Sequence, residues 1–193
     1  MKEKKLNLKK QKVVVMLQAR LGSSRLPQKV LLDLDGVPMI EHIMQQVSAV
    51  TGYDLEFVLS TSPDSLDDRL VDWATQKGLK VFRHNVDDIV GRLHGSLDLA
   101  GGDVLLRVWG DCVFICPDVI EKMLAMFFAR ELDFVTNAGE GRNLPVGLDC
   151  EIYSVNYLRR LNSQSDVFYR EFPLQFALRH SDVRWANYLA EQP

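Results

Sequence analysis

The stretch 12-KVVVMLQARLGSSRLPQKVL-31 joins an apolar run to a loop rich in basic and small residues. Residues 12–18 predict a buried central strand, because β-branched side chains favour extended backbone. The loop that follows would then lie beyond the carboxyl end of that strand, which is where ligands bind in open α/β sheets. This stretch therefore predicts both the central strand of the fold and a candidate binding loop.

Strand-like and helix-like runs alternate along the rest of the chain. We expect strands at 55–61, 80–83, 103–109, 133–138 and 148–154, and helices at 39–50, 65–78, 86–100 and 118–132. This alternation is typical of an α/β fold with a mainly parallel sheet flanked by helices. The segment from residue 155 onward is more helical and aromatic than the rest, and we expect an oligomer contact there.

Length and composition predict one globular domain. The chain has 193 residues with 25% charged and 47% hydrophobic residues, which is ordinary for a folded protein. Its formal net charge of -3 argues against general nucleic-acid binding. No apolar run approaches the roughly 20 residues of a membrane-spanning helix, so we expect a cytoplasmic protein that does not enter membranes.

The amino terminus is strongly basic, and the chain contains three cysteines. Residues 1–11 predict a disordered basic tail ahead of a domain at 12–193; a solubilising leader and an anionic-surface anchor are both open. The three cysteines, Cys112, Cys116 and Cys150, cannot close a disulfide framework and are expected to be reduced.

The first loop has the residue types that bind polyphosphates. Basic side chains supply positive charge, while a glycine and two serines let backbone N–H groups and hydroxyls approach phosphate oxygens: Arg20, Arg25, Lys29, Gly22, Ser23 and Ser24. The loop lacks the ending of a P-loop and the three-glycine spacing of a Rossmann dinucleotide site. On residue types alone, a solvated surface loop remains the alternative.

Asp111 is the second candidate, in the segment VWGDC. It follows the strand predicted at 103–109, and Gly110 permits close approach of the backbone. A carboxylate that faces a basic loop is suited to hold Mg²⁺ between phosphates, although a helix or turn cap is the alternative. Thr61 is placed to touch a nucleotide, whereas Ser65 is better explained as a helix cap.

Four segments in this order resemble the cytidylyltransferase family that activates acidic sugars. They are QARLGSSRLPQKVLLDLDGVPMIEH (18–42), FRHNVDDIVGRL (82–93), LRVWGDC (106–112) and PVGLDCEIYS (145–154). The branch most resembled is the spore coat polysaccharide biosynthesis protein F type; the 3-deoxy-manno-octulosonate and acylneuraminate enzymes are more distant. The resemblance implies a single-domain GT-A-like, Rossmann-like nucleotidyltransferase fold. It also implies CTP and a sugar as substrates, Mg²⁺ as cofactor and a homodimer.

The resemblance also assigns roles by position. Arg20, Lys29 and Asp111 match the catalytic residues: the first two hold the triphosphate and the third is the magnesium ligand. The nucleotide-binding set that it implies is Gln18, Ala19, Arg20, Gly22, Ser23, Ser24, Arg25, Lys29, Thr61, Arg92 and Asp111. Asp149 and Glu151 match positions that lie near the sugar substrate in the family. Asp149 also matches a position that can bind a second metal ion. The implied reaction transfers CMP from CTP to an acidic or amino sugar of surface polysaccharides, with release of pyrophosphate.

Several positions depart from the family pattern. Gln28 stands where relatives have glycine, and its side chain would crowd the turn that presents Lys29 if that turn needs a positive φ. Trp109 replaces a smaller polar residue. Relatives continue into a D-x-P-E-D-L segment whose aspartate supplies a second metal ligand, whereas this sequence ends at Pro193, so we expect weaker magnesium binding. Three functions therefore stay open: an active cytidylyltransferase, a weakened sugar-nucleotide binding module, and a glycosyltransferase of related fold.

Overall fold

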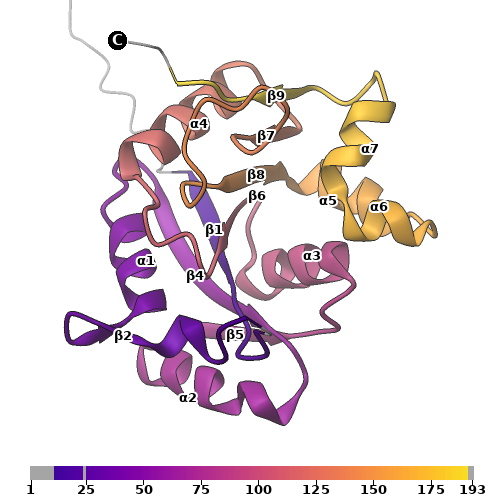
Figure 1. Cartoon of the computed structure of the whole chain (residues 1–193). Helices are drawn as coiled ribbons and strands as arrows, with labels where there is room; N and C mark the ends of the chain where they lie inside the picture. The colour runs from indigo at the N-terminus through magenta and orange to yellow at the C-terminus, as the bar shows by residue number, and fades with distance from the viewer. Residues whose placement is uncertain (1–10, 24, 191–193) are drawn as a thin grey trace, which may run out of the picture.

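The computed structural model describes residues 11–23 and 25–190 (Figure 1). Its main sheet has seven strands in the order β5-β4-β1-β6-β8-β7-β9. The strand β1 (Lys12–Gln18) pairs in parallel with β4 (Asp54–Thr61) on one side and with β6 (Val104–Trp109) on the other. The strand order reverses at β1, so the loops after these strands meet at one edge of the sheet. The predicted central strand is confirmed with the predicted bounds.

The flanks of the sheet are mixed in direction. β5 (Lys80–Arg83) pairs in parallel with β4, while β8 (Cys150–Ser154) runs antiparallel to both β6 and β7 (Phe134–Thr136). β9 (Trp185–Asn187) adds a parallel edge strand beside β7. The segment from residue 155 onward is otherwise helical, as expected. This short strand was not predicted, because its three residues gain strand pairing only from a distant neighbour. A two-stranded hairpin of β2 (Asp33–Leu34) and β3 (Val37–Pro38) was also not predicted.

Helices cover both faces of the sheet (Figure 1). α1 (Met39–Ser48), α2 (Asp68–Gln76) and α4 (Pro117–Ala129) pack on one face. α3 (Ile89–Ala100), α5 (Val155–Asn162) and α7 (Pro173–Arg179) pack on the other, together with the short α6 (Val167–Glu171). Alternate residues of β1 contact the two layers, and residues 13–17 are fully buried. The α/β layers are those predicted.

Helix starts follow local capping. α3 begins at Ile89, later than predicted, because the Asp88 side chain accepts a hydrogen bond from Gly91 N and caps it. The short 3₁₀ helix η2 (Ser65–Asp67) precedes α2, and its cap is Asp64, which accepts from Leu66 N. Ser65 is therefore not the cap, a correction to the sequence prediction. Among the described residues, no helix combines the length and apolar character needed to cross a membrane. The predicted basic tail lies almost wholly outside the described residues.

The three cysteines are free thiols, as predicted. The α6–α7 segment is only partly an exposed apolar surface. Phe176 is 1% exposed and belongs to the core, whereas Phe168, Phe172 and Leu178 are 40%, 46% and 52% exposed.

Candidate active site

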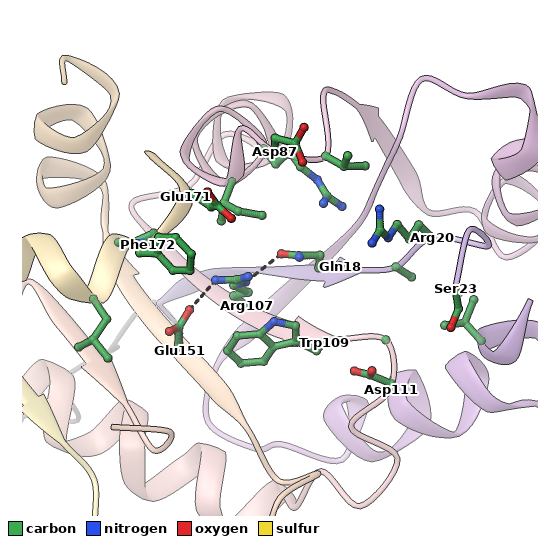
Figure 2. Close-up of a pocket in the computed structure, with 18 of the residues that line it drawn as sticks. Gln18, Arg20, Ser23, Asp87, Arg107, Trp109, Asp111, Glu151, Glu171 and Phe172 are labelled. Atoms are coloured by element: carbon green, nitrogen blue, oxygen red, sulfur yellow. Dashed lines mark hydrogen bonds and ion pairs between the residues drawn. The ribbon is translucent and has the colours of Figure 1, made fainter. Parts of the chain in front are cut away.

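A cavity of about 680 Å³ opens at the carboxyl edge of the sheet, above the ends of β1 and β6 (Figure 2). The loop after β1 forms one wall and the α6–α7 segment forms the opposite one. Most of the residues expected from the sequence are on its surface: Gln18, Ala19, Arg20, Ser23, Arg25, Lys29, Arg92, Asp111 and Glu151. Gly22 lines a smaller neighbouring cavity of about 420 Å³, which shares Arg20 with the larger one. Ser24 lies outside the described residues.

The loop after β1 is anchored from beneath by Asp67. This carboxylate is 1% exposed and accepts a hydrogen bond of 2.7 Å from Leu21 N. Thr61 Oγ1 donates to its other oxygen at 2.8 Å, as does the Ser62 hydroxyl. Burial alone raises the pKa of Asp67, but these hydrogen bonds outweigh it and the pKa is lowered. The loop is therefore tied to β4 by a buried carboxylate.

Thr61 thus differs from its predicted role. It is fully buried and its hydroxyl points at Asp67, so it does not line either cavity. The expected contact between Thr61 and a nucleotide is therefore wrong. Thr61 instead supports the loop after β1 through Asp67.

Gln28, which stands where relatives have glycine, adopts a positive φ. Its φ of 58° and ψ of 20° place it in the left-handed region, immediately before the 3₁₀ helix η1 (Lys29–Leu31). Its side-chain amide oxygen accepts a hydrogen bond of 2.6 Å from Arg69 Nη1. This contact helps to hold the side chain away from the cavity, so the turn forms with glutamine in place of glycine.

Lys29 and Asp111 meet at the mouth of the cavity. Lys29 Nζ lies 2.5 Å from Asp111 Oδ2, although the two residues are 82 positions apart in the chain. The approach of the two loops depends on Gly110, whose added Cβ would lie 2.7 Å from Ala19 Cβ. Gly110 N also donates to Gln18 O at 2.8 Å. The predicted close backbone approach at Gly110 is thereby present.

Arg92 brings a buried cation to the same cavity. It is 2% exposed, and it donates to Ser60 Oγ and Ser60 O at 3.2 and 2.6 Å. Burial, followed by repulsion from Arg107 and Arg20, lowers the pKa of Arg92 to about 10. No ion pair joins Arg92 to a carboxylate among the described residues. A bound polyanion would offset both the cost of burying this charge and the repulsion from the neighbouring arginines.

The cavity floor contains a charged network that spans three strands. Arg107 on β6 donates to Glu151 on β8 at 2.8 Å and to Gln18 Oε1 on β1 at 2.9 Å (Figure 2). Tyr153 donates its hydroxyl to the same Glu151 oxygen, and the Arg107 guanidinium lies 4.4 Å from the centroid of a Trp109 ring. Burial is the largest single influence and lowers the pKa of Arg107, but the charges of Glu151 and Tyr153 and the hydrogen bonds with them together outweigh it, so the pKa is raised.

Asp149 is not part of this floor. Its carboxylate pairs with Arg142 at 2.5 Å in the loop before β8, and it does not line the cavity. Glu151, two residues further along, does line the cavity, so the structure separates the two carboxylates that the sequence grouped together. The expected second metal position at Asp149 has no support from this geometry.

The opposite wall is held in place by an ion pair across two elements. Arg170 of α6 donates from Nε and Nη2 to the two oxygens of Asp88 at 2.9 and 2.8 Å. His84 Nε2 lies 2.9 Å from the same carboxylate. Burial raises the pKa of Asp88, but the bonds from Arg170, His84 and Gly91 outweigh it and lower the pKa to about 2. The clamp fixes the position from which Glu171 and Phe172 reach the cavity.

The donor set fits a magnesium ion that is shared with a substrate. Asp111 is a half-exposed carboxylate whose hydrogen-bond partner is Lys29. No group of three or more His, Cys, Asp or Glu side chains suited to metal binding occurs among the residues described. Mg²⁺ commonly binds through one or two carboxylates, waters and substrate phosphates, so a single aspartate beside a phosphate cradle meets that requirement.

The sequence did not predict three parts of the site: Arg107, Asp67 and the α6–α7 wall. The signal for Arg107 was a lone charged residue within the apolar strand VLLRVW, and Glu151 is likewise isolated in CEIYS. Isolated charges in buried strands need partners, and here they are paired with each other.

Comparison with known proteins identifies the family. The sequence profile of the family described as Cytidylyltransferase matches residues 14–183. The chain belongs to the cytidylyltransferase family. It is 27% identical over 149 residues to the spore coat polysaccharide biosynthesis protein SpsF of Bacillus subtilis, covering 76% of this chain and 60% of SpsF. It is 33% identical over 121 residues to the 8-amino-3,8-dideoxy-manno-octulosonate cytidylyltransferase of Shewanella frigidimarina, covering 60% and 47% of the two chains.

A solved structure also resembles this member of the cytidylyltransferase family. A cytidylyltransferase from Leptospira borgpetersenii serovar Hardjo-bovis superposes with a TM-score of 0.84 at 25% identity, covering 94% of this chain and 77% of that one. The nucleotidyltransferase fold that the motifs implied is confirmed. The chain spans about 60% or less of the length of the curated relatives named above.

Proposed function

We propose that this cytidylyltransferase transfers CMP from CTP to the hydroxyl of an acidic or amino sugar and releases pyrophosphate. The observation that carries the proposal is the convergence of Arg20, Arg25, Lys29 and Arg92 on one cavity that also holds Asp111. Four cations that face one carboxylate suit a metal-bound triphosphate. The family membership favours CTP as that triphosphate, and the activity for which the Shewanella frigidimarina relative is named favours a sugar as acceptor.

The chemistry is a displacement at phosphorus. The sugar hydroxyl gives its proton to solvent water as its oxygen bonds to the α-phosphorus, and the bond from that phosphorus to the oxygen leading to the β-phosphate breaks. Negative charge then accumulates on the leaving pyrophosphate. Arg20 and Lys29, which follow β1, would neutralise this charge. The buried Arg92 on α3 would bind a phosphate oxygen. Most of the catalysis is positioning and charge stabilisation.

Asp111 would hold Mg²⁺, which when bound adds positive charge to the phosphate oxygens and favours departure of pyrophosphate. On binding the ion, Asp111 would exchange Lys29 for the metal, because its carboxylate now pairs with the Lys29 ammonium. The released lysine is then available to the triphosphate.

The acceptor sugar would occupy the end of the cavity opposite to the basic loop. Trp109, Phe172 and Leu174 offer apolar surface there, and Glu171 and Gln175 offer polar groups to hydroxyls. The smaller cavity beside Arg20 is lined by Ser62, Asp64 and Asn85 among others, and this polar lining suits the nucleoside part of CTP.

The test measures pyrophosphate release with Mg²⁺ for each of CTP, UTP, ATP and GTP against a panel of 2-keto-3-deoxy and amino sugars. CTP-selective release that depends on one sugar class supports the proposal. Binding of CTP without release for any sugar would support a binding module instead, and release from UTP alone would exclude the cytidylyl assignment.

We also propose a homodimer in the cytoplasm, where CTP is available. The support is the exposed apolar group of Phe168, Phe172 and Leu178 on α6 and α7. Light scattering should give a mass near 44 kDa, about twice the chain mass of 22.0 kDa. Phe168→Ser should convert the dimer to a monomer; a wild-type mass near 22.0 kDa excludes the dimer.

A further inference from the structure

The side-chain amide of Gln18 has a fixed orientation at the centre of the cavity floor. Gln18 is the last residue of β1 and lines the cavity just before Arg20. Its Oε1 accepts from Arg107 Nε at 2.9 Å. An arginine Nε–H can only donate, so the atom that faces it must be the amide oxygen and not the nitrogen. The Gln18 NH₂ group is therefore turned away from Arg107 (Figure 2).

The network behind Gln18 prevents the amide from turning over. Glu151 holds the Arg107 guanidinium at 2.8 Å, and Tyr153 donates its hydroxyl to the same Glu151 oxygen. Arg107 and Glu151 are each 7% exposed. Trp109 covers one face of the guanidinium, with 4.4 Å between the guanidinium carbon and a ring centroid. The buried ion pair thus fixes the guanidinium, and the guanidinium fixes the amide.

The amide nitrogen is left as a donor. No hydrogen bond from Gln18 Nε2 to another described residue is present, so both N–H groups remain for a ligand. They lie between the basic loop, where a pyrophosphate would leave, and the acceptor end of the cavity. The group of a nucleotide that lies between those two positions is the α-phosphate.

We propose that Gln18 donates a hydrogen bond to an α-phosphate oxygen of CTP, and that Arg107 and Glu151 are positioning residues that hold the Gln18 amide in the donating orientation. The inference rests on the proposed function, since it takes CTP as the nucleotide. It goes further in assigning a task to a buried ion pair that touches the reacting phosphate only through Gln18.

Two substitutions at one position separate donation from structural support. Gln18→Glu keeps an oxygen for Arg107 but removes the donors and places a negative charge beside the phosphate. Gln18→Met keeps the length of the side chain and loses both the oxygen and the donors. If Gln18 only supports Arg107, the glutamate variant behaves as the unaltered protein and the methionine variant is the worse one. If Gln18 donates to phosphate, the order is reversed.

The measurement is the dissociation constant of CTP by calorimetry in the full chain with MgCl₂, together with the unfolding temperature. We expect Gln18→Glu to weaken CTP by about ten- to a hundredfold, more than Gln18→Met, with an unfolding temperature no lower than that of the unaltered protein. Gln76→Glu, an exposed site at the end of α2, is the charge-matched control and should change CTP affinity less than twofold. CTP affinity in Gln18→Glu within twofold of the unaltered protein, or better than in Gln18→Met, overturns the inference.

A double-mutant cycle tests the positioning role. Arg107→Lys keeps the charge for Glu151 but lacks the Nε–H that holds the amide. It should weaken CTP in the unaltered background and have no further effect in Gln18→Met, because its action passes through Gln18. Equal effects in both backgrounds overturn the positioning role. Absence of CTP binding to the unaltered protein overturns the proposed function. If the unaltered protein binds CTP and Gln18→Glu does not change the affinity, this inference alone is overturned.

Discussion

The ammonium of Lys29 and the carboxylate of Asp111 form a 2.5 Å ion pair that joins the loop after β1 to the loop after β6. Their side chains are 25% and 48% exposed. Exposed pairs of this kind contribute about 1 kcal/mol or less to stability. A triphosphate and a metal ion can therefore replace the pair at little cost, with each charge taking a new partner.

Replacing Lys29 by methionine should remove activity and leave the fold intact. The aliphatic part of the side chain is kept, while the charge that faces the leaving pyrophosphate is lost. We expect kcat/KM for CTP to fall by about a hundredfold or more, with the unfolding temperature changed by less than about 3 °C. Pyrophosphate release and thermal unfolding measure the two quantities. Lys77→Met, whose lysine pairs with Glu41 outside the cavity, is the control; equal losses of activity in both variants would remove the special role of Lys29.

Asp111→Asn should separate metal dependence from nucleotide affinity. The amide is a poor ligand for Mg²⁺, so the rise in turnover on adding MgCl₂ should largely disappear. In the absence of metal, Lys29 is no longer paired with a carboxylate and is free to meet the triphosphate. We therefore expect CTP in EDTA to bind to the variant as tightly as to the unaltered protein, or more tightly. Calorimetry with and without MgCl₂ checks this, and weaker binding in EDTA would show that Asp111 does not compete with the nucleotide for Lys29.

Gln28→Gly should be nearly neutral. Glycine removes the cost of about 1 kcal/mol for a side chain at φ 58°, but it also removes the bond to Arg69. These effects oppose each other, so we expect the free energy of unfolding to change by less than about 1 kcal/mol and kcat/KM for CTP by less than threefold. Arg69→Ala, which removes the same bond and keeps the glutamine, should destabilise the protein slightly. A large gain of activity in Gln28→Gly would show that glutamine limits the presentation of Lys29.

Local patterns were enough to predict the centre of the fold. Val13 to Leu17 favour a buried strand because of their shape and apolar character, and the helices with apolar residues three and four apart were predicted correctly in type. β9 was missed because its three residues become a strand only by pairing with β7. The β2–β3 hairpin was missed although Asp35 and Gly36, with φ of 54° and 89°, are a residue pair typical of tight hairpin turns.

Some residues of the site could also be predicted from the sequence, and others could not. The charges of the first loop and the carboxylate after β6 were predicted because their residue types and positions at strand ends suffice. The pairing of Arg107 with Glu151 was not predicted. It depends on the antiparallel pairing of β6 with β8, which sets the two residues opposite each other and which local sequence does not show. Thr61 was misassigned because sequence does not show toward which neighbour a hydroxyl points, and here the neighbour is the buried Asp67.

The clamp between Asp88 and Arg170 should make the protein sensitive to acid. The pKa of Asp88 is held at about 2, below its usual 3.8, so the folded state binds the proton less readily than the unfolded chain. A carboxylate with a lowered pKa contributes stability that is fully present above about pH 4 and is lost as the pH falls to about 2. The shift corresponds to about 2 kcal/mol. Asp88→Asn lacks this group and should be less stable at pH 7.

Urea unfolding at pH 7, 4, 3 and 2 measures the effect. The free energy of unfolding of the unaltered protein should fall between pH 4 and pH 2 by about 2 kcal/mol more than that of Asp88→Asn, so the two curves approach each other in acid. Asp98→Asn is a matched control: Asp98 also lies on α3 and pairs with His94, but its side chain is 64% exposed. A pH dependence of Asp88→Asn parallel to that of the unaltered protein would contradict the role of the clamp.

Loss of the clamp should also free α6, so the variant should have a higher KM for the acceptor sugar, because Glu171 and Phe172 are no longer held at the cavity.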